Sequence, residues 1–208
     1  MDALIAIFGS FIKVKIMRLF LFNESTPFLA KEVAARTKSP LPAVRREMHA
    51  LKKAGILWKR HVSKDIVSKH DKKIVSRKLT GDGYVLNNEF AYIEPLKSLL
   101  TITSIEADES LAKRFASVGK VKLVIVAGVF IQNWDSRVDL LIVGEELNLT
   151  KIENIIKGIE AEIGKEIAYS AFETPDFEYR LGIHDRLVRD ILDYPHVTLL
   201  DRLGIEIK

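Results

Sequence analysis

Apolar residues recur at helical spacing in the first part of the chain, and three segments predict helices: residues 12–22, 29–36 and 42–54. In the third segment, Val44, Met48 and Leu51 fall at positions i, i+4 and i+7, so we expect them to face a core. In the first segment, Lys15 and Arg18 are expected on the polar side of the helix.

After the third helix the pattern changes to one that is typical of β-strands. Residues 56–62 and 73–79 predict two strands, and the polar residues 63–72 are expected to form the loop between them. The Gly-Asp-Gly triplet at 81–83 is expected to close this hairpin, because glycine marks turns. The order of three helices and a hairpin predicts a first domain over residues 1–88.

The rest of the chain alternates between strand and helix patterns, and we expect a connecting helix and linker over residues 89–104 and a second domain over residues 105–208. Strands are predicted at 121–127, 138–143, 166–172 and 195–200, and helices at 107–118, 151–163 and 175–192. Arg186 and Arg189 lie near several acidic residues and are interpreted as part of a solvated helix face. The expected fold class is a two-domain α+β or α/β protein with a mixed sheet in its second domain.

Charge is distributed unevenly along the chain. Residues 1–90 contain 18 Lys and Arg against 8 Asp and Glu, a net charge of +10, whereas residues 91–208 contain 14 against 20, a net charge of −6. A basic half is typical of polyanion binders, because cations that neutralise phosphates release condensed counterions. The sequence has no cysteine, which excludes disulfides and suits a reducing cytoplasm, and it has no apolar run of about 18 residues that would span a membrane.

The third predicted helix carries a second stripe, because Arg45, His49 and Lys52 also fall at i, i+4 and i+7. The segment VRREMHALKKAGILWKR, residues 44–60, resembles the recognition helix of a winged helix-turn-helix domain running into its wing. This resemblance implies that the third helix enters the major groove of double-stranded DNA and that the wing touches backbone or minor groove. A winged helix that contacts another protein is the alternative.

Helix geometry and the resemblance together divide the candidate DNA-binding residues into two groups. Those in the first turns of the recognition helix are placed to reach base edges: Pro42, Arg45, Arg46 and His49. The remaining cations are placed to contact phosphates, which fixes register but carries no sequence preference: Lys52, Lys53, Lys59, Arg60, Lys72, Lys73 and Arg77.

Residues 124–144, VIVAGVFIQNWDSRVDLLIVG, resemble the minimal form of the nucleotidyltransferase superfamily. The family pattern is an apolar strand ending in Gly-Ser, then Ser-Asp-x-Asp-Leu-Leu on the next strand. Gly128 and Asp139 match this pattern, but Val129 replaces the serine that would touch triphosphate and Arg137 replaces the first metal carboxylate. Phosphoryl transfer commonly uses two carboxylates to hold a pair of metal ions about 4 Å apart.

The resemblance therefore implies a degenerate transfer site, with Gly128 and Asp139 as remnants. Arg137 is expected on the same face of a strand as Asp139, where it pairs with this carboxylate or contacts a nucleotide or other anion together with Gly128. No cofactor and no metal are expected. If the site is active instead, Mg²⁺ at Asp139 and a nucleotide triphosphate are implied.

The function expected from the two resemblances is that of a cytoplasmic transcriptional regulator. Its first domain binds double-stranded DNA as part of a homodimer, and its second domain serves dimerisation or ligand sensing, with a nucleotide as candidate ligand. One alternative is an Mg²⁺-dependent nucleotidyltransferase that modifies protein or RNA. A second alternative is a partner-binding protein of the toxin–antitoxin kind.

Overall fold

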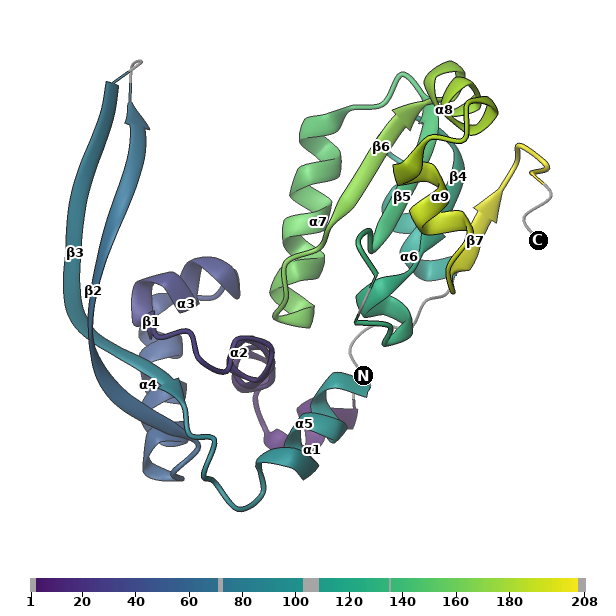
Figure 1. Cartoon of the computed structure of the whole chain (residues 1–208). Coiled ribbons are helices and arrows are strands. Elements are labelled where there is room, and N and C mark those ends of the chain that lie inside the picture. Colours follow the sequence, from purple (N-terminus) through teal and green to yellow (C-terminus); the bar gives the residue numbers. More distant parts are fainter. Residues whose placement is uncertain (1–2, 71–72, 103–108, 135, 206–208) are drawn as a thin grey trace. The chain divides into compact units, whose positions relative to one another are not determined.

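A computed structural model describes residues 3–70, 73–102, 109–134 and 136–205, and it describes their side chains except for those of 64–70, 73–79, 102 and 109. The described chain is a mixed α+β protein with two separate sheets, which confirms the coarse fold class (Figure 1). It divides into two compact units. Unit 1 is Met1–Thr101 with Ala161–Lys165, and unit 2 is Ile102–Glu160 with Glu166–Lys208.

Unit 1 contains the three predicted helices, with the boundaries shifted by one residue at most. Its elements are α1 (Ala3–Phe8), α2 (Phe11–Phe22), β1 (Phe28–Leu29), α3 (Ala30–Arg36), α4 (Leu41–Lys53), β2 (Leu57–His70), β3 (Lys73–Leu86) and α5 (Ile93–Ile102). Val44, Met48 and Leu51 of α4 are buried, as their spacing predicts, and they join α2 in one core. α4 gives way to β2 at Gly55, whose φ of 82° is a left-handed conformation that glycine adopts easily.

The hairpin of unit 1 is longer than the sequence pattern predicts. β2 and β3 pair antiparallel from Leu57–Leu86 to His70–Lys73. Residues 63–70, expected in a loop, belong to β2, and the triplet at 81–83 lies inside β3 instead of closing a turn. Cross-strand hydrogen bonds satisfy the backbone of both strands, so this part of the ladder forms without a run of apolar side chains.

Gly83 allows a third strand to join the hairpin. β1 pairs antiparallel with β3 through Phe28–Tyr84 and Leu29–Gly83, which gives the strand order β1-β3-β2. A Cβ at Gly83 would lie 2.4 Å from Cγ2 of Val62 and 3.0 Å from the carbonyl oxygen of Phe28. The close approach of β1 therefore requires a residue without a side chain at this position.

Lys15 and Arg18 of α2 are buried, which corrects the expectation that both lie on a polar face. The Nζ of Lys15 donates a hydrogen bond to the carbonyl oxygen of Thr37 at 3.3 Å and lies 4.3 Å from the ring centre of Phe11. Burial removes water from the ammonium group and lowers the pKa of Lys15. Periodicity misses such a residue, since a long basic side chain can bury its stem and still find a carbonyl.

Unit 2 is built on a four-stranded sheet. Its elements are α6 (Glu109–Arg114), β4 (Lys120–Val126), the 3-10 helix η1 (Gly128–Ile131), β5 (Leu140–Glu145), α7 (Leu149–Ile163, whose last residues from Ala161 belong to unit 1), β6 (Tyr169–Glu173), α8 (Thr174–Gly182), α9 (Arg186–Leu192) and β7 (Val197–Asp201). The strand order is β6-β5-β4-β7, with β5 and β6 parallel and the other pairs antiparallel. The sheet is therefore mixed, as predicted.

The predicted helix over 175–192 is two helices in the structure, α8 and α9. His184 has a φ of 57° between them, and this left-handed conformation interrupts helical hydrogen bonding. The carboxylate of Asp185 then caps α9 by accepting hydrogen bonds from the amides of Leu187 and Val188 at 3.0 and 3.4 Å. Because of this break, α9 runs in a different direction from α8 (Figure 1).

Both faces of the central strands β4 and β5 are largely buried. Leu123 and Ile125 of β4 pack in one cluster with Phe177 of α8 and Val188 of α9. Neighbouring residues of a strand point to opposite faces, so Val124 and Val126 face the other side, and they too are fully buried. β4 and β5 are neighbouring antiparallel strands, so the loop between them lies at one end of the sheet. α9 packs on one face of the sheet.

Candidate functional site

The two stripes of α4 have opposite surroundings. Val44, Met48 and Leu51 are buried, and the predicted DNA-binding residues of the helix are all exposed: Pro42, Arg45, Arg46, His49, Lys52 and Lys53. Lys59 and Arg60 of β2 are exposed as well. The burial of one stripe therefore directs the cationic stripe toward solvent.

A surface cavity of about 530 Å³ lies between α4 and the sheet of unit 1. Its lining includes Lys31 from α3, Arg45 and His49 from α4, and Lys59 from β2. The cavity therefore brings basic side chains together from three elements, a relation that the linear spacing of the sequence does not reveal.

Asp82 of β3 also lines this cavity and is paired with Lys59. The Nζ of Lys59 lies 2.6 Å from Oδ2 of Asp82. The hydrogen bond between them raises the pKa of Lys59 and lowers the pKa of Asp82. Asp82 therefore competes with a phosphate group for Lys59. The sequence prediction did not include this ion pair.

Three of the predicted phosphate contacts cannot be placed. Lys72 lies outside the described residues, and the side chains of Lys73 and Arg77 also lie outside the part that the structure describes. The backbones of Lys73 and Arg77 belong to β3, opposite His70 and Ile66 of β2.

Gly128 and Asp139, which the sequence analysis predicts to be remnants of a transfer motif, are in direct contact. Asp139 is 5% exposed, and its Oδ1 accepts a hydrogen bond from the amide of Val129 at 2.9 Å. Its Oδ2 accepts a second hydrogen bond from the amide of Ala168, also at 2.9 Å. The carboxylate thus joins the turn after β4 to the segment before β6.

The main chain of Asp139 continues this connection. Its carbonyl oxygen accepts from the amide of Ala127 at 2.9 Å, and its amide donates to the carbonyl of Ala168 at 2.6 Å. Gly128 is buried, with a φ of 52°. In this arrangement the amide of Val129, next to Gly128, is satisfied by Asp139 and points to no open anion site.

Arg137 does not pair with Asp139, which corrects the ion pair expected from the sequence. The two residues precede β5, and only Asp139 is buried there. The Nη1 of Arg137 lies 3.3 Å from Oδ2 of Asp190 on α9, and the side chain of Arg137 is 64% exposed. Because two backbone amides already satisfy Asp139, the guanidinium of Arg137 is left to interact across the loop with α9.

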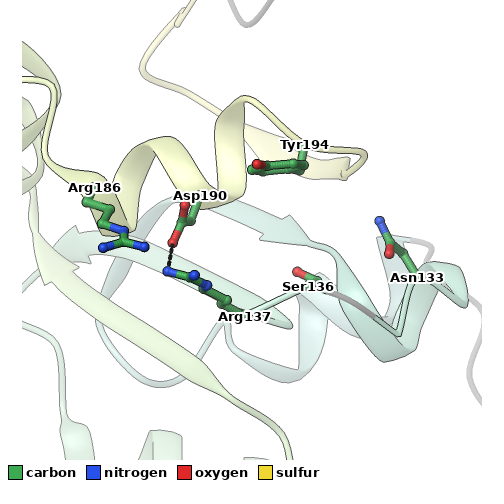
Figure 2. A pocket seen from close by; sticks show the side chains of 6 residues that line it. All are labelled: Asn133, Ser136, Arg137, Arg186, Asp190 and Tyr194. Carbon is green, nitrogen blue, oxygen red and sulfur yellow. Dashed lines mark hydrogen bonds and ion pairs between the residues drawn. The ribbon is translucent and has the colours of Figure 1, made fainter.

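A second cavity, of about 490 Å³, lies between this loop and α9 (Figure 2). Six residues line it: Asn133, Ser136, Arg137, Arg186, Asp190 and Tyr194. Arg186, Asp190 and Tyr194 are spaced four apart, so α9 and the residues after it present them along one side. Figure 2 shows the guanidinium groups of Arg137 and Arg186 near Asp190, with the ring of Tyr194 further along the same side.

The sequence interpretation missed both Arg186 and Asp190 as site residues: it assigned Arg186 to a solvated helix face and did not single out Asp190. Their four-residue spacing indicates that they lie on the same side of a helix. The structure adds that this helix is α9, which His184 separates from α8. Among the described residues, no group of three or more His, Asp and Glu side chains is arranged to hold a metal ion. The described helices also include none with the length and apolar character needed to cross a bilayer.

In comparisons with protein-family models, with curated proteins and with solved structures, nothing matches this chain.

Proposed function

We propose that unit 1 is a winged helix-turn-helix domain that binds double-stranded DNA. The order α2-β1-α3-α4-β2-β3 and the three-stranded sheet β1-β3-β2 support this assignment. In such a domain α4 is the recognition helix and the β2–β3 hairpin is the wing.

The observation that carries the proposal is the basic stripe of α4. Arg45, His49 and Lys52 are exposed on one side of the helix while Val44 and Met48 hold the other side in the core. The cavity beside this stripe adds Lys31 and Lys59 from two other elements. A polyanion that lies along α4 therefore meets basic side chains from three elements, with Asp82 as the acidic residue among them, and this excess of cations favours binding through counterion release.

Roles within this surface follow from position. Arg45 and Arg46 lie in the first turns of α4, where a guanidinium can donate two hydrogen bonds to a guanine, worth about 1–3 kcal/mol of discrimination. Lys52 and Lys53 lie in the last turn and are assigned to phosphates. We further propose that the protein acts as a homodimer on two-fold operators and that unit 2 serves dimerisation or ligand sensing.

The hydrogen bonding of Asp139 supports a non-catalytic role for unit 2. Both carboxylate oxygens accept from backbone amides, and the nearby position 137 carries a cation that would repel a metal ion. A nucleotidyltransferase remains the competing proposal. Incubation with labelled nucleotide triphosphates and Mg²⁺ tests it, and label transfer that disappears in Asp139→Ala while the variant stays folded would overturn the regulator proposal.

The regulator proposal is tested by duplex DNA binding as a function of salt. We expect the logarithm of the association constant to fall linearly with the logarithm of the salt concentration, and each phosphate-contacting cation that is removed should make this slope shallower by about 0.9. Lys52→Ala and Lys53→Ala should weaken all duplexes alike, whereas Arg45→Ala should also reduce discrimination between duplex sequences selected for binding.

Lys157→Ala provides a matched control, because Lys157 is an exposed lysine on α7 of unit 2. Its removal should leave DNA affinity and slope unchanged. An affinity that is indifferent to salt, or equal losses in Lys157→Ala and Lys52→Ala, would contradict the assignment of DNA binding to α4.

A further inference from the structure

The cavity between the loop and α9 in unit 2 contains the guanidinium of Arg186, for which no partner is recorded in the described part of the chain. Within the described residues, the structure records no hydrogen bond or ion pair of Arg186, and its side chain is exposed. The neighbouring arginines of the same region are paired: Arg180 with Asp176, and Arg189 with Asp193 at 2.8 Å. Among the three arginines of α8 and α9, Arg186 is thus the one for which the described residues supply no partner.

Arg137 adds a second guanidinium to the same cavity, and Asp190 restrains it. The pair is separated by 3.3 Å, with Asp190 the more buried partner at 22% exposed and Arg137 at 64%. A long, exposed arginine that is held by one oxygen of a carboxylate can exchange partners at low cost, because exposed ion pairs are worth about 0–1 kcal/mol. An anion that enters beside Arg186 can therefore compete with Asp190 for Arg137.

The other lining residues suit the remainder of a small organic molecule. Tyr194 is 60% exposed, and its ring lies at the side of the cavity (Figure 2). The hydroxyl of Ser136 donates to the carbonyl of Val138 at 2.7 Å, which leaves its oxygen to accept a hydrogen bond. The cavity volume of about 490 Å³ is in the range of small-molecule sites, about 300–1,000 Å³.

We propose that this cavity binds a small aromatic anion, with Arg186 as the anchor of its phosphate or carboxylate group, Arg137 as a second donor shared with Asp190, and Tyr194 as the surface for its ring. A planar guanidinium pairs with either anionic group through two parallel hydrogen bonds. The inference rests on the proposed ligand-sensing role of unit 2. It is independent of DNA binding by unit 1, because it is measured on the protein without DNA.

Asp190 gives the proposal a distinctive prediction, because its removal should strengthen binding. In Asp190→Asn the guanidinium of Arg137 is released and the competing negative charge is gone. A residue that only maintained the shape of the cavity would weaken binding when replaced. Opposite effects of Arg186→Ala and Asp190→Asn therefore separate an anion site from a structural cluster.

The test is calorimetric titration of the full chain, in a buffer free of phosphate and carboxylate, with phenyl phosphate, benzoate and inorganic phosphate. We expect phenyl phosphate or benzoate to bind, and the one that binds identifies the anionic group. Arg186→Ala should weaken this binding at least tenfold, and Asp190→Asn should tighten it several-fold. Tyr194→Ala should weaken binding of the aromatic probe, and if that probe is phenyl phosphate, the affinity for inorganic phosphate should stay unchanged.

Arg189→Ala is the matched control, since Arg189 lies on the same helix outside the cavity lining. It should bind the probes as the unaltered protein does. Absence of binding by both aromatic probes, or equal losses in Arg186→Ala and Arg189→Ala, or weaker binding by Asp190→Asn, would overturn the proposal. Failure of duplex DNA binding by the same protein would bear only on the role of unit 1.

Discussion

A side chain at Gly128 would collide with Asp139, because an ideal Cβ there lies 1.9 Å from the Oδ1 atom that accepts the hydrogen bond of the Val129 amide. Gly128 also has a φ of 52°, which costs an L-residue roughly 1–2 kcal/mol. A glycine at position 128 is therefore required by the buried carboxylate of Asp139. Its presence needs no bound phosphate to explain it.

Gly128→Ala should lower the free energy of unfolding of unit 2 by about 2–3 kcal/mol, through backbone strain and loss of the hydrogen bond to Val129. Trp58 lies in unit 1 and Trp134 in unit 2, and the chain has no other tryptophan. In a Trp58→Phe background, urea unfolding followed by the fluorescence of Trp134 reports on unit 2. Gly182→Ala is the control, because nothing lies within 4 Å of a Cβ there, and a gain of about 0.5 kcal/mol or no change is expected.

Asp139→Asn should destabilise unit 2 by about 1–3 kcal/mol. The side-chain amide of asparagine keeps only one acceptor oxygen, so the backbone amide of either Val129 or Ala168 would face the NH₂ donor instead of an acceptor. Asp176→Asn on the exposed side of α8 should change stability by less than about 0.5 kcal/mol. The same Trp134 fluorescence measurement compares them, and an Asp139→Asn protein as stable as Asp176→Asn would show that the carboxylate is not a structural connection.

The sequence predicts the fold of unit 1 where buried apolar residues recur at a regular spacing along an element. The stripe of Val44, Met48 and Leu51 and the glycine at position 55 define α4 almost to the residue. The sequence pattern underestimates the length of the hairpin, because residues 63–70 carry many polar side chains. These residues form a strand through backbone pairing with residues 73–80. Pairing between distant residues leaves no periodic signal on one strand alone.

The candidate site of unit 2 was predicted only in part, for a related reason. The sequence pattern singled out Arg137 and Asp139, but it paired them with each other because they are two residues apart. The structure gives each a partner from a distant segment, Asp190 for Arg137 and the amide of Ala168 for Asp139. The left-handed conformation of His184 separates α9, which carries Asp190, from α8, and the sequence pattern predicts one continuous helix there.

Asp82→Asn should tighten duplex DNA binding if unit 1 is the DNA-binding unit. The substitution releases Lys59 and removes the negative charge from the cavity beside α4. We expect higher affinity for all duplexes and a salt slope that is steeper by about 0.9, equivalent to one further phosphate contact. Fluorescence anisotropy with labelled duplexes over a range of salt measures both quantities, with Asp176→Asn as the control. Unchanged or weaker binding would place the DNA surface away from Lys59.

Lys15 should make the stability of unit 1 depend on pH in the alkaline range. Burial lowers the pKa of Lys15 below its ordinary value of 10.5, so the unfolded chain binds this proton more tightly than the folded protein does. The charged group therefore opposes folding at neutral pH, and this cost is lost as the pH rises through the lowered value toward 10.5. Lys15→Met should be at least as stable as the unaltered protein at pH 7, and its advantage should shrink at about pH 9.5. Urea unfolding followed by Trp58 in a Trp134→Phe background measures the difference, with the exposed Lys53→Met as control. An advantage of Lys15→Met that grows with pH would contradict the assigned direction.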